Sequence, residues 1–305
     1  QGIYLDDHFN LNGNSSLQIS GSLGFHSNKV ESEFGLNSLQ IFYPEMNAQK
    51  NRLLKSISAK YKYSVNMFEF GFGGGYGDRA PSVSEGYGFY LFNSSEKYDY
   101  VGNPNLNNES SLEANAFAAF KNERISAKLS SSYFHISDYI VAKVIEGLVP
   151  MTIGGKGVKQ YGSLDYATIF NADLNTQVQL FSFLKWNSQF TYARGKDYSK
   201  ENLPFMSPLS YRSALQFYKN RLSAEFSVFG NSRYRDFAAV YGETETPDYT
   251  IFNVNAGYQF SFNGMKVLTK IGVENIFDRI YTTYADWNKI PRPGRNFYLN
   301  LNLNF

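Results

Sequence analysis

The last ten residues of the chain, 296–305, alternate without interruption between polar and apolar side chains. Successive side chains of a β-strand point to opposite faces, so this run predicts a strand with one apolar and one polar face. The apolar set is Phe297, Leu299, Leu301, Leu303 and Phe305, and the polar set is Asn296, Tyr298, Asn300, Asn302 and Asn304. Because free termini usually fray, a strand that runs to an aromatic last residue favours a closed barrel in a bilayer, where no strand edge can be left unpaired.

The same period of two recurs along the whole chain and predicts roughly twelve strands. They cover residues 16–26, 55–63, 67–75, 110–120, 125–136, 168–180, 184–192, 211–219, 222–233 and 251–262, with two more after residue 265. Their polar faces carry Asp, Glu, Gln and Lys, which a dry core does not accept unpaired but a water-filled lumen does. Residues 1–12 are interpreted as the end of a preceding strand, and no helical segment is expected.

The predicted connections alternate between short and long. The long ones are about 29–54, 76–109, 137–163, 194–210, 234–249 and 280–294, and the intervening turns have about two to four residues. Short periplasmic turns and long outer loops are typical of outer-membrane barrels. The pattern therefore predicts an all-β, antiparallel transmembrane barrel with its C-terminus on the short-turn, periplasmic side.

Composition excludes several other classes of protein. Aromatic residues make up 17% and charged residues 18% of the chain, against roughly 25% charged in soluble domains. No apolar run approaches the ~20 residues that a membrane-spanning helix needs. The net charge of +2 gives no case for nucleic acid, and the absence of Cys excludes disulfides and thiolate metal sites. The chain begins at Gln1 without Met or a signal peptide, so we expect a processed chain or a piece of a longer one.

Four short motifs occur along the chain in a fixed order. They are Arg79-Ala80-Pro81-Ser82, Gly102-Asn103-Pro104-Asn105-Leu106 with Glu109, Gly272-Val273-Glu274-Asn275-Ile276-Phe277-Asp278 with Tyr281, and Pro291-Arg292-Pro293-Gly294-Arg295-Asn296-Phe297 with the terminal Phe305. Each motif alone is weak, but together with the strand pattern they resemble the C-terminal part of the barrel of TonB-dependent outer-membrane receptors. The resemblance covers most of residues 1–305, in which no second domain is apparent.

This resemblance implies a 22-stranded barrel with a plug folded inside, in the outer membrane of a Gram-negative bacterium. About twelve strands fit the C-terminal half of such a barrel, and neither a plug nor a TonB box is visible in the chain. Three explanations remain open: the chain is part of a longer receptor, a second polypeptide supplies the rest, or the chain closes as a small barrel by itself.

The resemblance also implies a function, which is TonB-dependent uptake of a scarce nutrient and not enzyme catalysis. The implied cargo is a small-molecule or metal-chelate substrate, foremost an iron–siderophore; copper, cobalamin-like and glycan cargo stay open. The implied partners are TonB, through a plug absent from this chain, outer-membrane lipid and, less directly, a surface lipoprotein. No cofactor is expected. The alternatives are a passive porin or structural barrel and an outer-membrane lipid hydrolase.

Candidate ligand-binding residues are aromatic side chains in the predicted outer loops: Tyr90, Tyr98, Tyr100 and Trp287. Tyr and Trp bury a large area at low entropic cost and keep a polar group, which suits ligand capture, although an aromatic girdle at the membrane interface is the competing interpretation. The motif residues are interpreted as architectural, setting turns or packing on the lumen wall: Arg79, Pro81, Asn103, Pro104, Asn275, Gly294, Arg295 and Phe305.

Three weaker hypotheses accompany these. His26 and Met46 would suit a soft metal such as copper, against the simpler interpretation of a solvated His and a gap-filling Met. The glycine-rich run 71–77 resembles a phosphate-binding loop only superficially, because no helix follows it; alternate glycines in a strand instead make room for packed lumen contents or a bend. A hydrolase would need a serine next to His135 on a neighbouring strand, because Ser131, four residues away on the same strand, lies ~13 Å from it.

Overall fold

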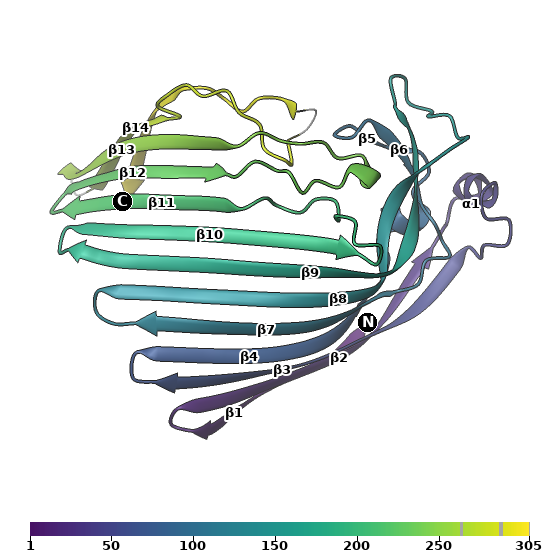
Figure 1. The fold of residues 1–305 in the computed structure, drawn as a ribbon, viewed down its shortest axis with the longest axis horizontal. Helices are drawn as coiled ribbons and strands as arrows, with labels where there is room; N and C mark the ends of the chain where they lie inside the picture. The colour runs from purple at the N-terminus through teal and green to yellow at the C-terminus, as the bar shows by residue number, and fades with distance from the viewer. Residues whose placement is uncertain (263–264, 287–288, 305) are drawn as a thin grey trace.

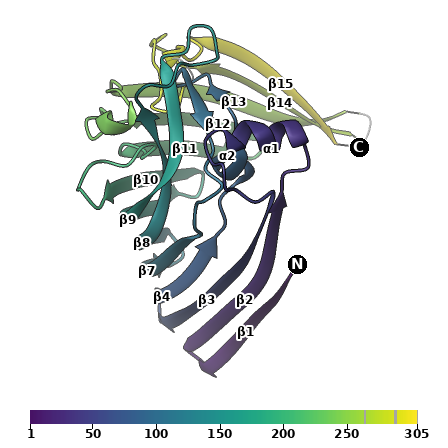
Figure 2. The ribbon, with the colours of Figure 1, turned by 90° about the vertical axis from the view of Figure 1, so that its right-hand side faces the viewer.

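The computed structural model describes residues 1–262, 265–286 and 289–304, and a single curved antiparallel sheet makes up most of them (Figures 1 and 2). Its strands follow one another in chain order, with a small hairpin attached at one side. The strands on the main path are β1 (Gly2–Asn12), β2 (Ser15–Lys29), β3 (Gln49–Val65), β4 (Phe68–Arg79), β7 (Glu109–Lys121), β8 (Ile125–Ile145), β9 (Gly157–Phe181), β10 (Leu184–Asp197), β11 (Ser210–Lys219), β12 (Leu222–Asn231), β13 (Tyr249–Phe262), β14 (Met265–Glu274) and β15 (Asn296–Asn304). The predicted strands are confirmed, and residues 1–12 do form a strand, β1.

The sheet is an open arc within the described residues. β1 pairs only with β2, and β15 pairs only with β14. Figure 2 shows the arc nearly end-on, with β1 and β15 at its two ends. The described chain therefore does not close a small barrel by itself.

The two faces of the arc differ as the alternation predicts. The pairing register places apolar side chains opposite apolar ones across many strands, as with Phe25 and Leu53 or Tyr61 and Phe72. On β15 the apolar face is bare, with Leu299 65% exposed. The opposite, inner face is polar and lines a hollow of about 800 Å³ along β8 to β15. None of the described helices is long and apolar enough to cross a membrane.

Long connections all emerge at one end of the sheet, opposite the short turns (Figure 1). They contain α1 (Glu33–Gln40), α2 (Val83–Tyr87), β5 (Leu91–Asn93), β6 (Tyr98–Val101) and η1 (Ala239–Tyr241). The expectation of no helix was wrong: Ser32 and Ser82 cap α1 and α2 by accepting hydrogen bonds from the Gly35 and Glu85 amides. We call residues 30–48, 80–108, 146–156, 198–209 and 232–248 the loop layer.

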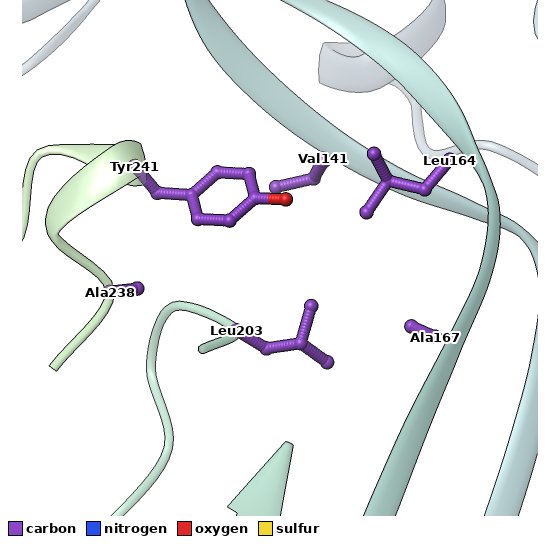
Figure 3. Packing of buried hydrophobic residues seen from close by; sticks show 6 residues of the cluster. All are labelled: Val141, Leu164, Ala167, Leu203, Ala238 and Tyr241. Carbon is purple, nitrogen blue, oxygen red and sulfur yellow. The ribbon is translucent and has the colours of Figure 1, made fainter. Parts of the chain in front are cut away.

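The predicted loop 137–163 was too long. β8 and β9 continue past the regular alternation and leave only residues 146–156 as a connection. In this extension the loop layer covers Val141 and Leu164. Apolar side chains are buried here, so the sequence does not show the regular alternation of polar and apolar residues that a strand between lipid and lumen has. Figure 3 shows Leu203, Ala238 and Tyr241 meeting Val141 and Leu164. This buried apolar cluster thus lies between the loop layer and the extended ends of β8 and β9.

Candidate functional site

Lys159 of β9 joins two segments of the loop layer, residues 80–108 and 232–248. Its side chain is only 2% exposed. Its ammonium donates to the carboxylate of Glu96 and, over 2.8 Å, to the carbonyl oxygen of Tyr241. It also lies 4.9 Å from the centroid of the Tyr98 ring and 5.6 Å from that of Tyr100. Tyr98 and Tyr100, two of the predicted ligand-binding residues, therefore surround a buried cation.

Two further buried carboxylates hold the same layer together. Asp99, which is fully buried, accepts hydrogen bonds from the Thr152 amide (2.9 Å) and hydroxyl (2.6 Å). Asp197 accepts a 2.8 Å bond from the Tyr241 hydroxyl. Burial and this bond to a carboxylate raise the pKa of Tyr241, so its hydroxyl stays a neutral donor. The loops after β5, β8 and β12 and the end of β10 are therefore held together by charged and polar contacts.

Arg79 and Pro81, from the first receptor-like motif, frame the start of α2. The Arg79 guanidinium donates to Glu109 (2.5 Å) and to both oxygens of Glu85 (2.8 and 3.2 Å). Glu85 also accepts from the backbone of Ser82, whose hydroxyl accepts from the Glu85 amide, which is a capping box. Pro81 is buried beside this turn. Arg79 thus ties the end of β4 to α2 and to the start of β7.

The second motif packs on the first. The Asn103 amide donates to the carbonyl oxygen of Glu85 (2.8 Å), and its side chain accepts from the Asn105 amide (2.9 Å). The buried Pro104 presents its carbonyl oxygen to the ammonium of Lys50 over 3.0 Å. Two motifs about twenty residues apart therefore form one structural unit between β3 and α2.

The last two motifs shape the turn before β15. Asn275 is 4% exposed at a left-handed φ of 50°; its side chain donates to the Arg279 carbonyl (2.8 Å) and accepts from the Arg279 amide (2.9 Å). The Arg295 amide donates to Asp278 (2.7 Å) and its guanidinium to the carbonyl of Ile276 (2.8 Å). Gly294 has no room for a side chain, because a Cβ there would lie 2.4 Å from the Asp278 carboxylate. Trp287 and Phe305 lie outside the described residues.

Tyr90, the third predicted ligand-binding residue, belongs to a separate group of rings. Its centroid is 5.1 Å from that of Phe89 and 6.3 Å from that of Phe42, and Phe42 and Phe89 are 6.1 Å apart. Tyr90 adopts a left-handed φ of 49°. The next residue after Phe42, Tyr43, accepts a 2.6 Å bond from Gln160, and burial raises its pKa to about 12. We call Phe42, Phe89 and Tyr90 the aromatic triad; all three are half-buried.

The two weak metal candidates lie in different surroundings. His26 is half-buried on β2 opposite Arg52 of β3. Met46 is 7% exposed and lines a small hollow with Lys50 and Tyr87. Within the described ranges, no three His, Cys, Asp or Glu side chains gather as metal ligands would.

Two other hypotheses meet definite geometry. Residues 71–77 lie inside β4, not in a loop that opens a helix, so the nucleotide-loop alternative is wrong. His135 of β8 stacks on Tyr166, with centroids 5.0 Å apart, and its register partners are Leu112 and Thr168. No serine hydroxyl is hydrogen-bonded to His135 in the part of the chain that the structure describes.

Comparison with known proteins gives the same fold. The family model of the β-barrel of TonB dependent receptor-like proteins matches residues 1–276. The solved copper transporter OprC superposes with a TM-score of 0.84 at 19% identity, covering 100% of this chain and 47% of that one. The siderophore receptor PirA from Pseudomonas aeruginosa gives a TM-score of 0.68 at 20% identity, with coverages of 98% and 47%. The ferric-catecholate import receptor Fiu from E. coli K12 gives 0.69 at 11% identity, with coverages of 100% and 44%.

No curated protein sequence matches the chain. The chain spans about half the length of the solved structures that it resembles. At these identities the structures establish the fold alone, whereas the family model covers most of the sequence. The chain therefore belongs to the TonB-dependent receptor family, whose β-barrels lie in the outer membrane of Gram-negative bacteria.

Proposed function

We propose that this chain forms the C-terminal part of the barrel of a receptor that takes up a scarce nutrient across the outer membrane, with energy delivered through TonB. The observation that carries the proposal is the receptor-barrel match over residues 1–276. The open arc supports it, because β1 and β15 each have one edge unpaired among the described residues, and there the rest of a barrel would pair. In this arrangement TonB acts on a plug that belongs to the rest of the receptor.

The loop layer is the outer, ligand-facing side in this proposal. β15 runs away from the loop layer and ends among the short turns, which in outer-membrane barrels face the periplasm. Bare apolar side chains on the outer face, such as Leu299, then contact outer-membrane lipid. Buried ion pairs and hydrogen bonds hold the loops in a preformed shape, which lowers the entropic cost of binding a ligand.

The cargo that we favour is an iron–siderophore or a similar metal chelate. The aromatic triad offers half-buried rings at the loop end, and such rings bind the organic part of a chelate with little loss of conformational entropy. Neighbours described as a siderophore receptor, a ferric-catecholate receptor and a copper transporter agree with metal-related cargo. Tyr98, Tyr100 and Trp287 stay candidate ligand residues, and a surface lipoprotein stays a candidate partner.

The test is uptake of radiolabelled ferric siderophores by cells that carry the full receptor and lack their own iron-chelate receptors. The proposal predicts saturable uptake that falls to background when TonB is deleted. Tyr90→Asn, which keeps a residue tolerant of the left-handed backbone, is expected to weaken ligand binding about tenfold. Tyr198→Asn, at an exposed aromatic residue elsewhere in the loop layer, is the matched control. Uptake that continues without TonB would instead identify a passive pore.

A further inference from the structure

Phe117 of β7 departs from the pattern of the inner face. The other inward side chains of this strand are polar or small, among them Ser111, Glu113 and Asn115. The Phe117 ring lies across the neighbouring strand at Gly71, where a Cβ would be 2.1 Å from the ring. The absence of a side chain at Gly71 thus makes the space that the ring occupies.

Two lysines from different strands approach this ring. The ammonium nitrogen of Lys128 on β8 is 4.4 Å from the ring centroid, and that of Lys60 on β3 is 5.7 Å from it. A cation over the face of an aromatic ring is attracted to it, which biases the direction of a flexible lysine. The ring therefore brings together two cations that are far apart in the sequence.

Neither lysine is paired with a carboxylate in the described part of the chain. The contrast with Lys62 is informative, because Lys62 lies on the same strand and the same face as Lys60 and is 3.2 Å from Glu69. Asp173 lines a hollow together with both lysines, and its side chain accepts a 2.8 Å bond from Thr191. Two like charges held near one ring create a positive potential that attracts an anion.

The surroundings have the size and the donors for such an anion. A hollow of about 200 Å³ is lined by Lys60, Lys128 and Phe117 together with Asn115, Ser130 and Ser132, and Asp173 borders it. We propose that Lys60, Phe117 and Lys128 form a binding site for an oxyanion, a carboxylate or phosphate that carries an organic part. The ammonium groups and hydroxyls bind the oxygens, and the ring contacts the organic part. This site is distinct from the aromatic triad and does not depend on TonB-driven uptake.

The first experiment follows the lysines directly in the purified full receptor. The lysines are labelled as ¹³C-dimethyl-lysine and observed by NMR during titration with inorganic phosphate and with citrate. Lys60→Gln and Lys128→Gln identify the two signals by removing them. We expect both signals to move together to saturation at one midpoint, and either substitution to weaken binding at the other lysine about fivefold to tenfold. Lys62→Gln, which removes the lysine paired with Glu69, is the matched control and leaves the midpoint unchanged.

A second experiment distinguishes a dissolved anion from a carboxylate of the receptor's own polypeptide. Carbodiimide joins an amine to a carboxylate only where the two are in contact. If a protein side chain fills the site, Lys60 or Lys128 forms an amide with an Asp or Glu other than Asp173, found by peptide mass spectrometry, and added phosphate causes no saturable shift. A saturable shift with added anion and a cross-link to such an Asp or Glu each support an oxyanion site.

Phe117→Leu keeps an apolar side chain but removes the ring, so it is expected to weaken binding and to separate the two midpoints. Heat-modifiable migration in gels establishes that each variant folds. Two results together would overturn the proposal. The NMR shifts of both lysines would rise linearly with anion concentration, as they do for any surface lysine, and neither lysine would be cross-linked to a carboxylate other than Asp173.

Discussion

Replacing Lys159 with Met is expected to loosen the loop layer selectively. The substitution keeps a flexible chain of similar length, so it removes the charge with little loss of packing. It leaves the Glu96 carboxylate without its cation and the Tyr241 carbonyl without its donor. It also removes the cation from the face of the Tyr98 ring.

The size of the effect follows from burial. Removing one partner of a buried ion pair costs about 3–5 kcal/mol. The Glu96 side chain keeps 14% exposure, so water reaches it in part and the lower end, about 3 kcal/mol, applies. That free energy corresponds to roughly a 100-fold increase in the local opening equilibrium.

Hydrogen–deuterium exchange of the full receptor measures this opening. The informative amides are Lys156, bonded to the Lys97 carbonyl (2.7 Å), and Tyr234, bonded to the Thr246 carbonyl (2.9 Å). Lys159→Met is expected to speed their exchange about 100-fold and to leave the strands far from the loop layer unchanged. Lys200→Met, at an exposed lysine in the same layer, is the control and is expected to change exchange little.

A second substitution tests the cause. Adding Glu96→Gln to Lys159→Met removes the uncompensated buried carboxylate, so exchange is expected to slow again towards the wild-type rate. Exchange within about threefold of wild type in Lys159→Met alone would refute the argument, because it would mean that the buried pair contributes no local stability.

Three further predictions concern the turn before β15. Gly294→Ala places a methyl carbon 2.4 Å from a carboxylate oxygen of the same turn, so it is expected to reduce the heat-modifiable folded fraction, whereas Gly13→Ala, with no atom within 4 Å, is not. Asn275→Ala removes the hydrogen bonds of a buried amide and is expected to destabilise the turn by about 2–4 kcal/mol, measured as accelerated exchange at residues 276–286. Burial alone would raise the pKa of Asp286, but the hydrogen bond from Arg292 gives a net lowering of that pKa. The ionised carboxylate therefore stabilises the turn above its unfolded pKa of about 3.9. Proteolysis of the turn is expected to rise as the pH falls below that value.

These three predictions have clear contrary results. Equal folded fractions for the two alanine variants would mean that the turn accommodates a side chain at Gly294. Unchanged exchange in Asn275→Ala would mean that water replaces the lost bonds. A proteolysis profile that Asp286→Asn does not flatten would assign the acid sensitivity to another group.

The strands were predictable because alternation is a local property of the sequence. Val254 and Asn253 point to opposite faces whatever the rest of the chain does. The register of β12 and β13 then places apolar residues opposite apolar ones and polar residues opposite polar ones. The family resemblance predicts that the motif residues form turns and line the wall, and the structure gives Arg79 and Asn275 definite partners.

The loop layer was not predictable in the same way. The fold brings together residues that are far apart in the sequence, namely Val141, Leu164 and Tyr241. The periodicity of the sequence therefore does not predict their contact. Lys159 was missed for the same reason, because a buried lysine is recognisable only by its partners. α2 was missed although Ser82 and Glu85 form the spacing of a capping box, a signal present in the sequence.

Cysteine accessibility on β15 tests the central claim most directly. The chain has no cysteine, so single substitutions at Leu299, Asn300, Leu301 and Asn302 introduce the only thiols in residues 1–305. In outer membranes of intact cells, a membrane-impermeant charged thiol reagent small enough to enter the barrel and a lipid-soluble reagent are applied to each variant. The account predicts strict alternation, with the leucine positions labelled only from lipid and the asparagine positions labelled only from water. Labelling of all four positions by the water-soluble reagent would contradict a lipid-facing receptor barrel.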